Sequence, residues 1–308
     1  MIVVCGEALI DLVVSGDGEA IPSPGGGPFN AARALARLGV PTAFLGHFSN
    51  DDFGRLLAGR LSADGADLRL ASFGPEPTTL AVARIGSDGL AQYEFSIAGT
   101  SAPSLTPDMI PASLPAEADC LHLGTLGLLL EPIGSSLAQM LEREAGRRLV
   151  MLDPNIRERL ATEPGYRRRL HWCIARSTVV KASADDLAWL YPGLGYEAAA
   201  ERVLEAGPRL VMVTRGPKGA YGTDGRNRIG VPAAPADVVD TIGAGDAFGA
   251  AAVAWLHEHG LLRTDLRLSS GELNSLLEFS ALAASLTCAR AGAEPPWRSE
   301  LNAAAGAH

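Results

Sequence analysis

The sequence predicts a doubly wound α/β fold, in which helices flank a mostly parallel β-sheet and a small β-sheet forms a lid. Three observations support this. Short apolar runs alternate with longer amphipathic segments along most of the chain, which is the pattern of βαβ units. Residues 11–24 and 78–97 interrupt the alternation. The length of 308 residues suits one large α/β unit with a small appendage, so we expect a single domain over 1–308.

Strands of the main sheet are expected where a short apolar run is bounded by turn residues. Residues 2–5 form the first of these runs. Apolar residues at helical spacing, ended by Gly39, predict a helix over 29–39. Further strands are expected in 43–48, 120–124, 149–153, 178–183 and 210–214.

The two interruptions predict the lid. Apolar residues alternate with period two in 78–97, which predicts a hairpin of 80–85 with 92–95 that turns at 86–89. Residues 11–24 are short, acidic and contain Gly and Pro. We interpret the stretches of about 11–24 and 75–101 as a lid over the carboxyl edge of the main sheet, where α/β proteins bind ligands. An edge hairpin without a gating role is the alternative.

Composition narrows the classes of function. The chain has 26 Lys and Arg against 35 Asp and Glu, so no general field attracts nucleic acid or anionic lipid, and neither is an expected partner. Local backbone dipoles can still hold a phosphorylated ligand. The four cysteines are far apart and include no C-x-x-C pair, which is typical of reduced thiols. Without a basic leader or a long apolar stretch, the sequence predicts a cytoplasmic protein.

The segment 236–251 carries the most chemical information. An acidic, β-branched run ends in the small residues Gly243, Ala244 and Gly245, and an Ala-rich helix then begins. Backbone N–H groups at such a helix start form a natural anion pocket. Asp246 lies in this pocket, either as an ordinary charge at a helix N-terminus or as a base that deprotonates a hydroxyl during phosphoryl transfer.

Other glycine motifs fit less well. The sequence contains no Walker A pattern, which disfavours a P-loop NTPase. Gly243, Gly245 and Gly249 have the spacing G-x-G-x-x-x-G, one residue away from the dinucleotide fingerprint. A nicotinamide-dependent oxidoreductase is therefore a distant alternative.

Residues 240–248 read DTIGAGDAF, which resembles the D-T-x-G-A-G-D-x-F signature of the ribokinase-like (PfkB) carbohydrate kinases. A second family signature has a counterpart in residues 24–32, PGGGPFNAA. The resemblance covers essentially the whole chain. It implies a ribokinase-like fold and transfer of the terminal phosphoryl group of ATP to a primary sugar hydroxyl. It also implies that Asp246 is the base and that residues 243–245 form the anion hole.

The resemblance implies a sugar site made by Asp11, Gly26 and Asn30. A carboxylate accepts hydrogen bonds from two hydroxyls, a carboxamide both donates and accepts, and a glycine lets the sugar approach the backbone. The alternatives are that Asp11 is a surface acid, Gly26 a turn residue and Asn30 a helix cap. Residues 153–157, DPNIR, are similar to a motif of fructokinases and 2-keto-3-deoxygluconate kinases, which implies that Arg157 contacts the sugar or the phosphates. The alternative is that Arg157 packs over the edge of the sheet.

The resemblance also implies positions for ATP, Mg²⁺ and K⁺. The implied ATP-binding residues are Lys181, Ser183, Thr214, Gly216, Gly243, Gly245 and Ser280, the last beside an adenine slot near the 230s loop. Asp186 stands in place of the glutamate of the family's N-x-x-E element and is implied to order the water shell of magnesium. Asp240 and Gly292 are implied to hold potassium, which would tune the anion hole.

Fructose is the predicted acceptor, because the glycine turn and residues 50–54 look most like those of fructokinases. Gly124 and Thr125 stand where ribokinases carry a sugar-contacting glutamate, which disfavours ribose. Phe29, where many fructokinases have Ala, is expected to narrow the pocket. The alternatives are 2-keto-3-deoxygluconate, ribose or a nucleoside as acceptor, and a non-catalytic sugar-binding protein. A homodimer through the lid is a further expectation.

Overall fold

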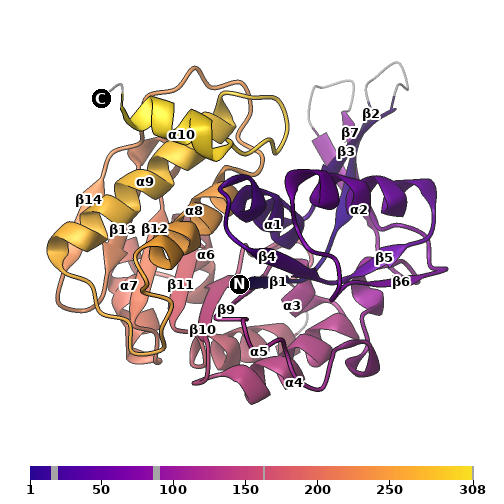
Figure 1. Cartoon of the computed structure of the whole chain (residues 1–308), viewed down its shortest axis with the longest axis horizontal. Coiled ribbons are helices and arrows are strands. Elements are labelled where there is room, and N and C mark those ends of the chain that lie inside the picture. The colour runs from indigo at the N-terminus through magenta and orange to yellow at the C-terminus, as the bar shows by residue number, and fades with distance from the viewer. Residues whose placement is uncertain (15–19, 86–90, 162–163, 307–308) are drawn as a thin grey trace.

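The computed structural model describes residues 1–14, 20–85, 91–161 and 164–306 (Figure 1). Its centre is an eight-stranded sheet with the order β14-β13-β12-β11-β10-β9-β1-β4. Six of these strands run parallel: β1 (Ile2–Cys5), β4 (Thr42–Leu45), β9 (Cys120–Gly124), β10 (Leu149–Asp153), β11 (Val179–Ser183) and β12 (Leu210–Thr214). The predicted strands are thus confirmed, with 43–48 divided into β4 and β5 (His47–Ser49). β13 (Ala220–Thr223) and β14 (Arg228–Val231) add an antiparallel edge.

Helices cover both faces of this sheet (Figure 1). Successive side chains of a strand point to opposite faces, so Ile2 and Val4 join one apolar cluster and Val3 and Cys5 join the other. The first cluster includes residues of α1 (Gly27–Arg37), α2 (Asp52–Asp64), α8 (Ala244–Glu258), α9 (Ser270–Cys288) and α10 (Arg298–Ala305). The second includes residues of α3 (Leu126–Leu129), α4 (Ile133–Glu144), α5 (Pro164–Ile174), α6 (Ala184–Leu190) and α7 (Tyr196–Glu205).

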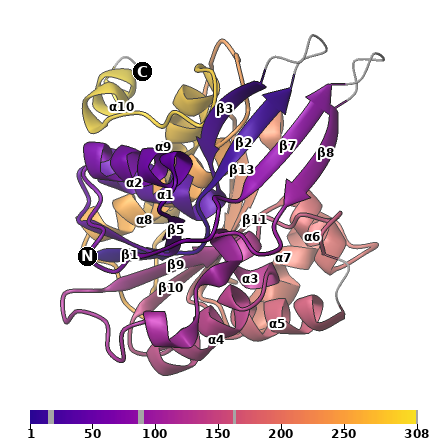
Figure 2. The same ribbon diagram turned by 90° about the vertical axis from the view of Figure 1, so that its right-hand side faces the viewer.

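A separate four-stranded sheet projects from the main body (Figure 2). Its order is β3-β2-β7-β8, formed by β3 (Ala20–Gly25), β2 (Leu9–Val14), β7 (Leu80–Ile85) and β8 (Ala91–Ser96). β2 pairs parallel with β7, whereas the two outer pairs are antiparallel. The predicted hairpin and the strands of the segment 11–24 are therefore present. The turn predicted at 86–89 lies outside the described residues.

A two-stranded parallel sheet of β5 with β6 (Ser72–Gly74) lies beside these elements. The described residues also include three short 3-10 helices: η1 (Ala102–Ser104), η2 (Pro107–Met109) and η3 (Gly216–Lys218). Among the helices described, none has both the length and the apolar character needed to cross a bilayer.

Candidate active site

Polar residues gather where the parallel strands end. Asp153, Ser183 and Thr214 are the last residues of β10, β11 and β12. Thr125 follows β9, and its N–H donates to the Asp153 carbonyl oxygen at 3.1 Å. Because parallel strands end at the same edge of their sheet, these residues line one rim, which is the usual ligand-binding edge of an α/β fold.

The N-terminus of α8 forms a turn with open N–H groups. Gly243 is its N-cap and has φ 77°, a left-handed conformation that favours glycine. A Cβ added to Gly243 would lie 2.6 Å from the Cβ of Ala293, so this turn is packed tightly against the loop after α9. No side chain caps this helix, and although the Ala244 N–H donates to the Thr241 carbonyl oxygen at 3.4 Å, the Gly245 N–H is available to an anion. We call residues 243–245 the anion turn.

Asp246 lies directly after the anion turn and is only 7% exposed. Its Oδ2 accepts a hydrogen bond from Asn30 Nδ2 at 2.9 Å, and its Oδ1 accepts one from Asn155 Nδ2 at 3.5 Å. Burial, helped by the charge of Asp153, raises the pKa of Asp246 to about 7, although Lys181 and the Asn30 hydrogen bond oppose the rise. A carboxylate with this pKa is suited to general-base catalysis near neutral pH.

A buried ion pair lies beneath the anion turn. Lys181 Nζ contacts Asp153 Oδ2 at 2.8 Å, and Lys181 is 3% exposed. Burial alone would lower the pKa of Lys181, but the charge and hydrogen bond of Asp153 raise it, so the ammonium keeps its proton. A Cβ added to Gly245 would lie 3.0 Å from Lys181 Nζ. The predicted ATP-binding residue Lys181 is thus placed below the turn rather than on the open rim.

The glycine turn before α1 connects the small sheet to Asp246. Gly26 has φ 105°, and a Cβ added there would lie 2.9 Å from the carbonyl oxygen of Glu7, so a larger residue is excluded. On one side of this turn, a Cβ added to Gly25 would overlap the carboxylate of Asp11. On the other, a Cβ on Gly27 would lie 3.3 Å from Asp246 Oδ1.

The side chains of the predicted sugar-binding residues Asp11, Asn30 and Arg157 differ in burial. Burial raises the pKa of Asp11 to about 6, and the nearby charge of Arg157 opposes the rise. Asn30 is buried, and among the described residues its Oδ1 has no hydrogen-bond partner. The charge of the exposed Arg157 also opposes the rise in the pKa of Glu7 and of Asp246 that burial causes. Phe29 is wholly buried in the apolar core, so the expectation that it narrows the pocket is wrong.

Three residues of this region were not assigned to the site in the sequence analysis. Glu7 is buried after β1, its Oε2 accepts from the Gly127 N–H at 2.8 Å, and burial raises its pKa to about 8. Thr125 (φ 56°) and Asn155 (φ 38°) have left-handed conformations that are unusual for residues other than glycine. The available signal for Glu7 was an acid two residues after a wholly apolar strand. The positive φ angles of Thr125 and Asn155 have no corresponding signal in the sequence.

The predicted nucleotide and magnesium residues divide into three groups. Thr214 and Gly216 lie at the rim, the latter exposed at the start of η3. Ser183 caps α6, and Asp186 Oδ2 accepts from its N–H at 2.8 Å and from its hydroxyl at 2.7 Å, while Asp186 Oδ1 accepts from the Ile156 N–H at 2.7 Å. Ser280 is 0% exposed and donates to the Leu276 carbonyl oxygen at 2.7 Å, so it cannot reach a nucleotide and that prediction is wrong.

Asp240 and Gly292, which the resemblance implies hold potassium, are hydrogen-bonded to each other. Asp240 Oδ2 accepts a hydrogen bond from the Gly292 N–H at 2.9 Å, and Oδ1 accepts one from the Ile242 N–H at 3.0 Å. Carboxylate oxygens have further lone pairs, so this corner remains able to bind a cation. Within the described residues, no three His, Cys, Asp or Glu side chains form a metal-binding group.

A buried carboxylate of raised pKa beside an open anion turn, at the ligand-binding edge of a parallel sheet, is the arrangement expected of a phosphoryl-transfer enzyme. The chain matches the pfkB family carbohydrate kinase over residues 1–300, and it belongs to that family. The ribokinase-like fold predicted from the sequence is confirmed, and the protein is a carbohydrate kinase that phosphorylates a sugar hydroxyl.

Individual relatives show how similar these chains are. The fructokinase of Rhizobium leguminosarum bv. trifolii is 37% identical over 267 residues, which cover 85% of this chain and 81% of that one. The structure of a fructokinase with bound ATP from Xylella fastidiosa gives a TM-score of 0.89 at 24% identity, over 98% of this chain and 97% of that one. A Vibrio cholerae fructokinase in a form with fructose, ADP and calcium ion bound gives 0.84 at 25% identity over the same shares.

Proposed function

We propose that the protein is an ATP-dependent fructokinase that converts fructose to fructose 6-phosphate, with Asp246 as general base. The observation that carries the proposal is the position of Asp246, between the anion turn and the Asn30 side chain. The 37% identity to a bacterial fructokinase supports fructose as the acceptor. Because Phe29 lies in the core, its size does not argue against fructose as the acceptor.

The mechanism is a direct in-line transfer. Asp11 and Asn30 would bind sugar hydroxyls and present the primary hydroxyl to Asp246. Asp246 would take the hydroxyl proton as the oxygen forms a bond to the terminal phosphorus of ATP and the bond from that phosphorus to the ADP oxygen breaks. The N–H groups of the anion turn would stabilise the negative charge on the transferred group. Arg157 would add positive charge from the open side of the site.

The residues of the site fit a divalent ion held mainly by the nucleotide. Magnesium keeps several waters and commonly binds substrate phosphates with one or two carboxylates, so the lack of a cage among the described residues is compatible with it. It would neutralise charge on the phosphates. Asp186 is buried, unlike Asp240, and its two oxygens accept three hydrogen bonds, so we assign Asp186 to holding the loop after β10 rather than the ion. Potassium would bind beside Asp240 and the Gly292 loop.

The small sheet would act as a lid that excludes water, which otherwise competes for the phosphoryl group. Thr214 and Gly216 would line the nucleotide side of the rim. A homodimer through the small sheet is a further proposal, which sedimentation of the purified protein would test.

Fructose-dependent ADP release tests the function. We expect ATP, Mg²⁺ and fructose to give turnover, and 2-keto-3-deoxygluconate, ribose and nucleosides to give less; the same panel with and without K⁺ tests the monovalent site. Sugar binding without ADP release would contradict the kinase assignment, and preferred turnover of another acceptor would replace fructose.

A further inference from the structure

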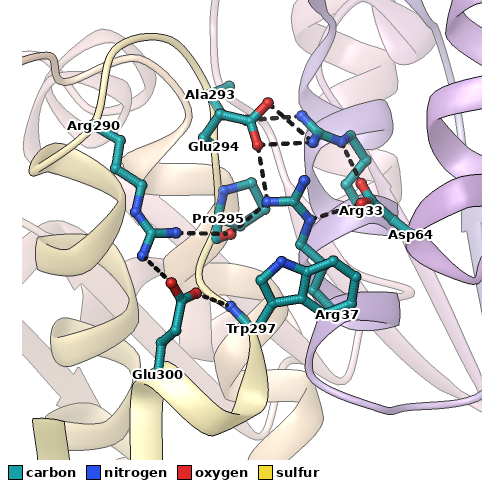
Figure 3. Close-up of polar contacts among 9 residues, drawn as sticks. All are labelled: Arg33, Arg37, Asp64, Arg290, Ala293, Glu294, Pro295, Trp297 and Glu300. Carbon is teal, nitrogen blue, oxygen red and sulfur yellow. Dashed lines mark hydrogen bonds and ion pairs between the residues drawn. The ribbon is translucent and has the colours of Figure 1, made fainter. Parts of the chain in front are cut away.

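Two arginines of α1 hold the loop that follows α9, residues 289–297 (Figure 3). Arg33 is 2% exposed, and Arg37, four residues later, is also buried. This spacing places both side chains on one face of the helix. Each points toward the same two carboxylates, Asp64 at the end of α2 and Glu294 in the loop.

Arg33 donates hydrogen bonds from all three nitrogen atoms of its guanidinium group. Its Nε donates to Asp64 Oδ2 at 2.6 Å, its Nη1 donates to the Ala293 carbonyl oxygen at 3.1 Å, and its Nη2 donates to both Glu294 oxygens at 3.0 and 3.1 Å. A lysine could not make these contacts together, because its ammonium is a compact point charge.

Arg37 repeats the arrangement one turn later. Its Nε donates to Asp64 Oδ1 at 2.8 Å, and its Nη1 donates to the Pro295 carbonyl oxygen at 2.8 Å and lies 2.9 Å from Glu294 Oε2. Two arginines and two carboxylates therefore balance in charge. We call these four residues, Arg33, Arg37, Asp64 and Glu294, the arginine clamp.

The clamped loop supports the anion turn. Ala293, whose carbonyl oxygen Arg33 holds, is the residue packed against Gly243. Its neighbour Gly292 donates to Asp240. The same helix, α1, carries Asn30, which donates to Asp246. Helix α1 thus contacts the base directly and supports the anion turn through the clamp.

Stability alone gives little reason for such a cluster. Replacing buried ion pairs by apolar residues of similar size is often neutral or stabilising, whereas removing one partner is costly. The loop also has a second anchor away from α1, since Arg290 Nη2 donates to Glu300 Oε1 at 2.8 Å (Figure 3). The clamp adds a fixed position for Ala293, which packs against the anion turn.

We propose that the arginine clamp positions the anion turn for phosphoryl transfer, with Glu294 as the positioning residue that fixes the loop. The proposal rests on the proposed function. Glu294 is the part to test, because its side chain is 35% exposed and Asp64 continues to hold both arginines when Glu294 is removed. The sugar contacts of Asp11 and Asn30 then stay in place.

The test compares Glu294→Ala with the matched control Glu300→Ala, which removes a carboxylate from the other anchor of the same loop. We expect Glu294→Ala to lower kcat about tenfold or more, because small misplacements of catalytic groups cost up to about 10²-fold. The KM for fructose should change less than about twofold, since its contacts are retained. Glu294→Gln keeps the size and an acceptor oxygen and should recover most of the activity, whereas the control should resemble the wild type.

A second measurement reports on the anion turn itself. ADP with aluminium fluoride and fructose mimics the transition state, and we expect Glu294→Ala to weaken its binding by the same factor as kcat while ADP alone binds normally. Glu294→Asp, which keeps the charge but shortens the side chain, should give the same pattern if the alanine variant does not fold.

Three results would overturn the clamp as a positioning device. They are a kcat of Glu294→Ala within twofold of wild type, an equal loss in Glu300→Ala, and an equal loss of affinity for ADP alone. Each requires an active wild-type enzyme. Absence of fructose-dependent ADP release from the wild type would instead refute the proposed function.

Discussion

Asn30 and Asp246 are 216 residues apart in the sequence, yet Asn30 Nδ2 donates to Asp246 Oδ2 at 2.9 Å. The two motifs of the chain thus meet at one hydrogen bond between the start of α1 and the start of α8. The bond orients the carboxylate and leaves Asn30 Oδ1 without a partner among the described residues. A sugar hydroxyl placed there would contact both side chains.

Asp246→Asn removes the base and keeps the size of the side chain. We expect turnover to fall at least ~10²-fold, which is the usual contribution of a general base, with ATP affinity nearly unchanged. Steady-state kinetics and ATP titration by calorimetry check this. Near-normal turnover in a variant that binds ATP tightly would show that another group accepts the proton.

Turnover should depend on pH through Asp246, which must be ionised to act as a base. Its pKa of about 7 in the free protein predicts that kcat/KM rises as the pH increases through 7. Asp153 raises this pKa and Lys181 lowers it, so Asp153→Asn should move the rise to lower pH and Lys181→Met to higher pH. Lys181→Arg, which keeps the charge, is the control. Shifts in the same direction for both neutral variants would contradict the assignment.

Asn30→Ala removes the hydrogen bond that lowers the pKa of Asp246, together with a proposed sugar contact. We expect a higher KM for fructose and a rise of kcat/KM at higher pH than in the wild type. The loss should be about tenfold or more in kcat/KM, because a hydrogen bond to a charged group contributes about 1.5–3 kcal/mol. Kinetics across pH 6–9 provide the measurement, and an unchanged KM for fructose would remove Asn30 from the sugar site.

Glu7 makes stability depend on pH. Its pKa is about 8 in the folded protein against an ordinary value of 4.5, so between these values the folded state binds more protons than the unfolded state. The free energy of unfolding therefore falls as pH rises through this window. Glu7→Gln removes this contribution, and its Tm relative to wild type should be higher at pH 8 than at pH 5. If the difference in Tm between Glu7→Gln and wild type were the same at pH 5 and pH 8, Glu7 would be ionised in the folded state.

Asp186→Asn distinguishes a structural role from a metal-binding one. The carboxylate closes the capping box of α6 and holds the Ile156 N–H, so we expect a loss of about 1 kcal/mol in stability. The Mg²⁺ concentration for half-maximal activity should stay near that of wild type. A large increase in that concentration, measured beside Ser183→Ala as a capping control, would return Asp186 to the metal site.

Local patterns predicted the strands of the main sheet that are buried and mostly apolar, because both faces of that sheet are covered. They missed β13 and β14, which are short, include glycine and lie at the sheet edge. The motif predicted Asp246 and the turn before it. It could not predict that Lys181 pairs with Asp153 or that Ser280 faces the core, because these depend on how distant elements pack.

The small sheet also has a chemical consequence. Asp11 belongs to β2 of that sheet, whereas Asp246 is fixed to the main body by α8. A substrate held by both carboxylates would bridge the small sheet and the main body. The distance between the two bound hydroxyls would then set the separation of these two parts. Acceptors too short to span the two sheets would leave them apart, and size selection would follow from architecture as well as from individual hydrogen bonds.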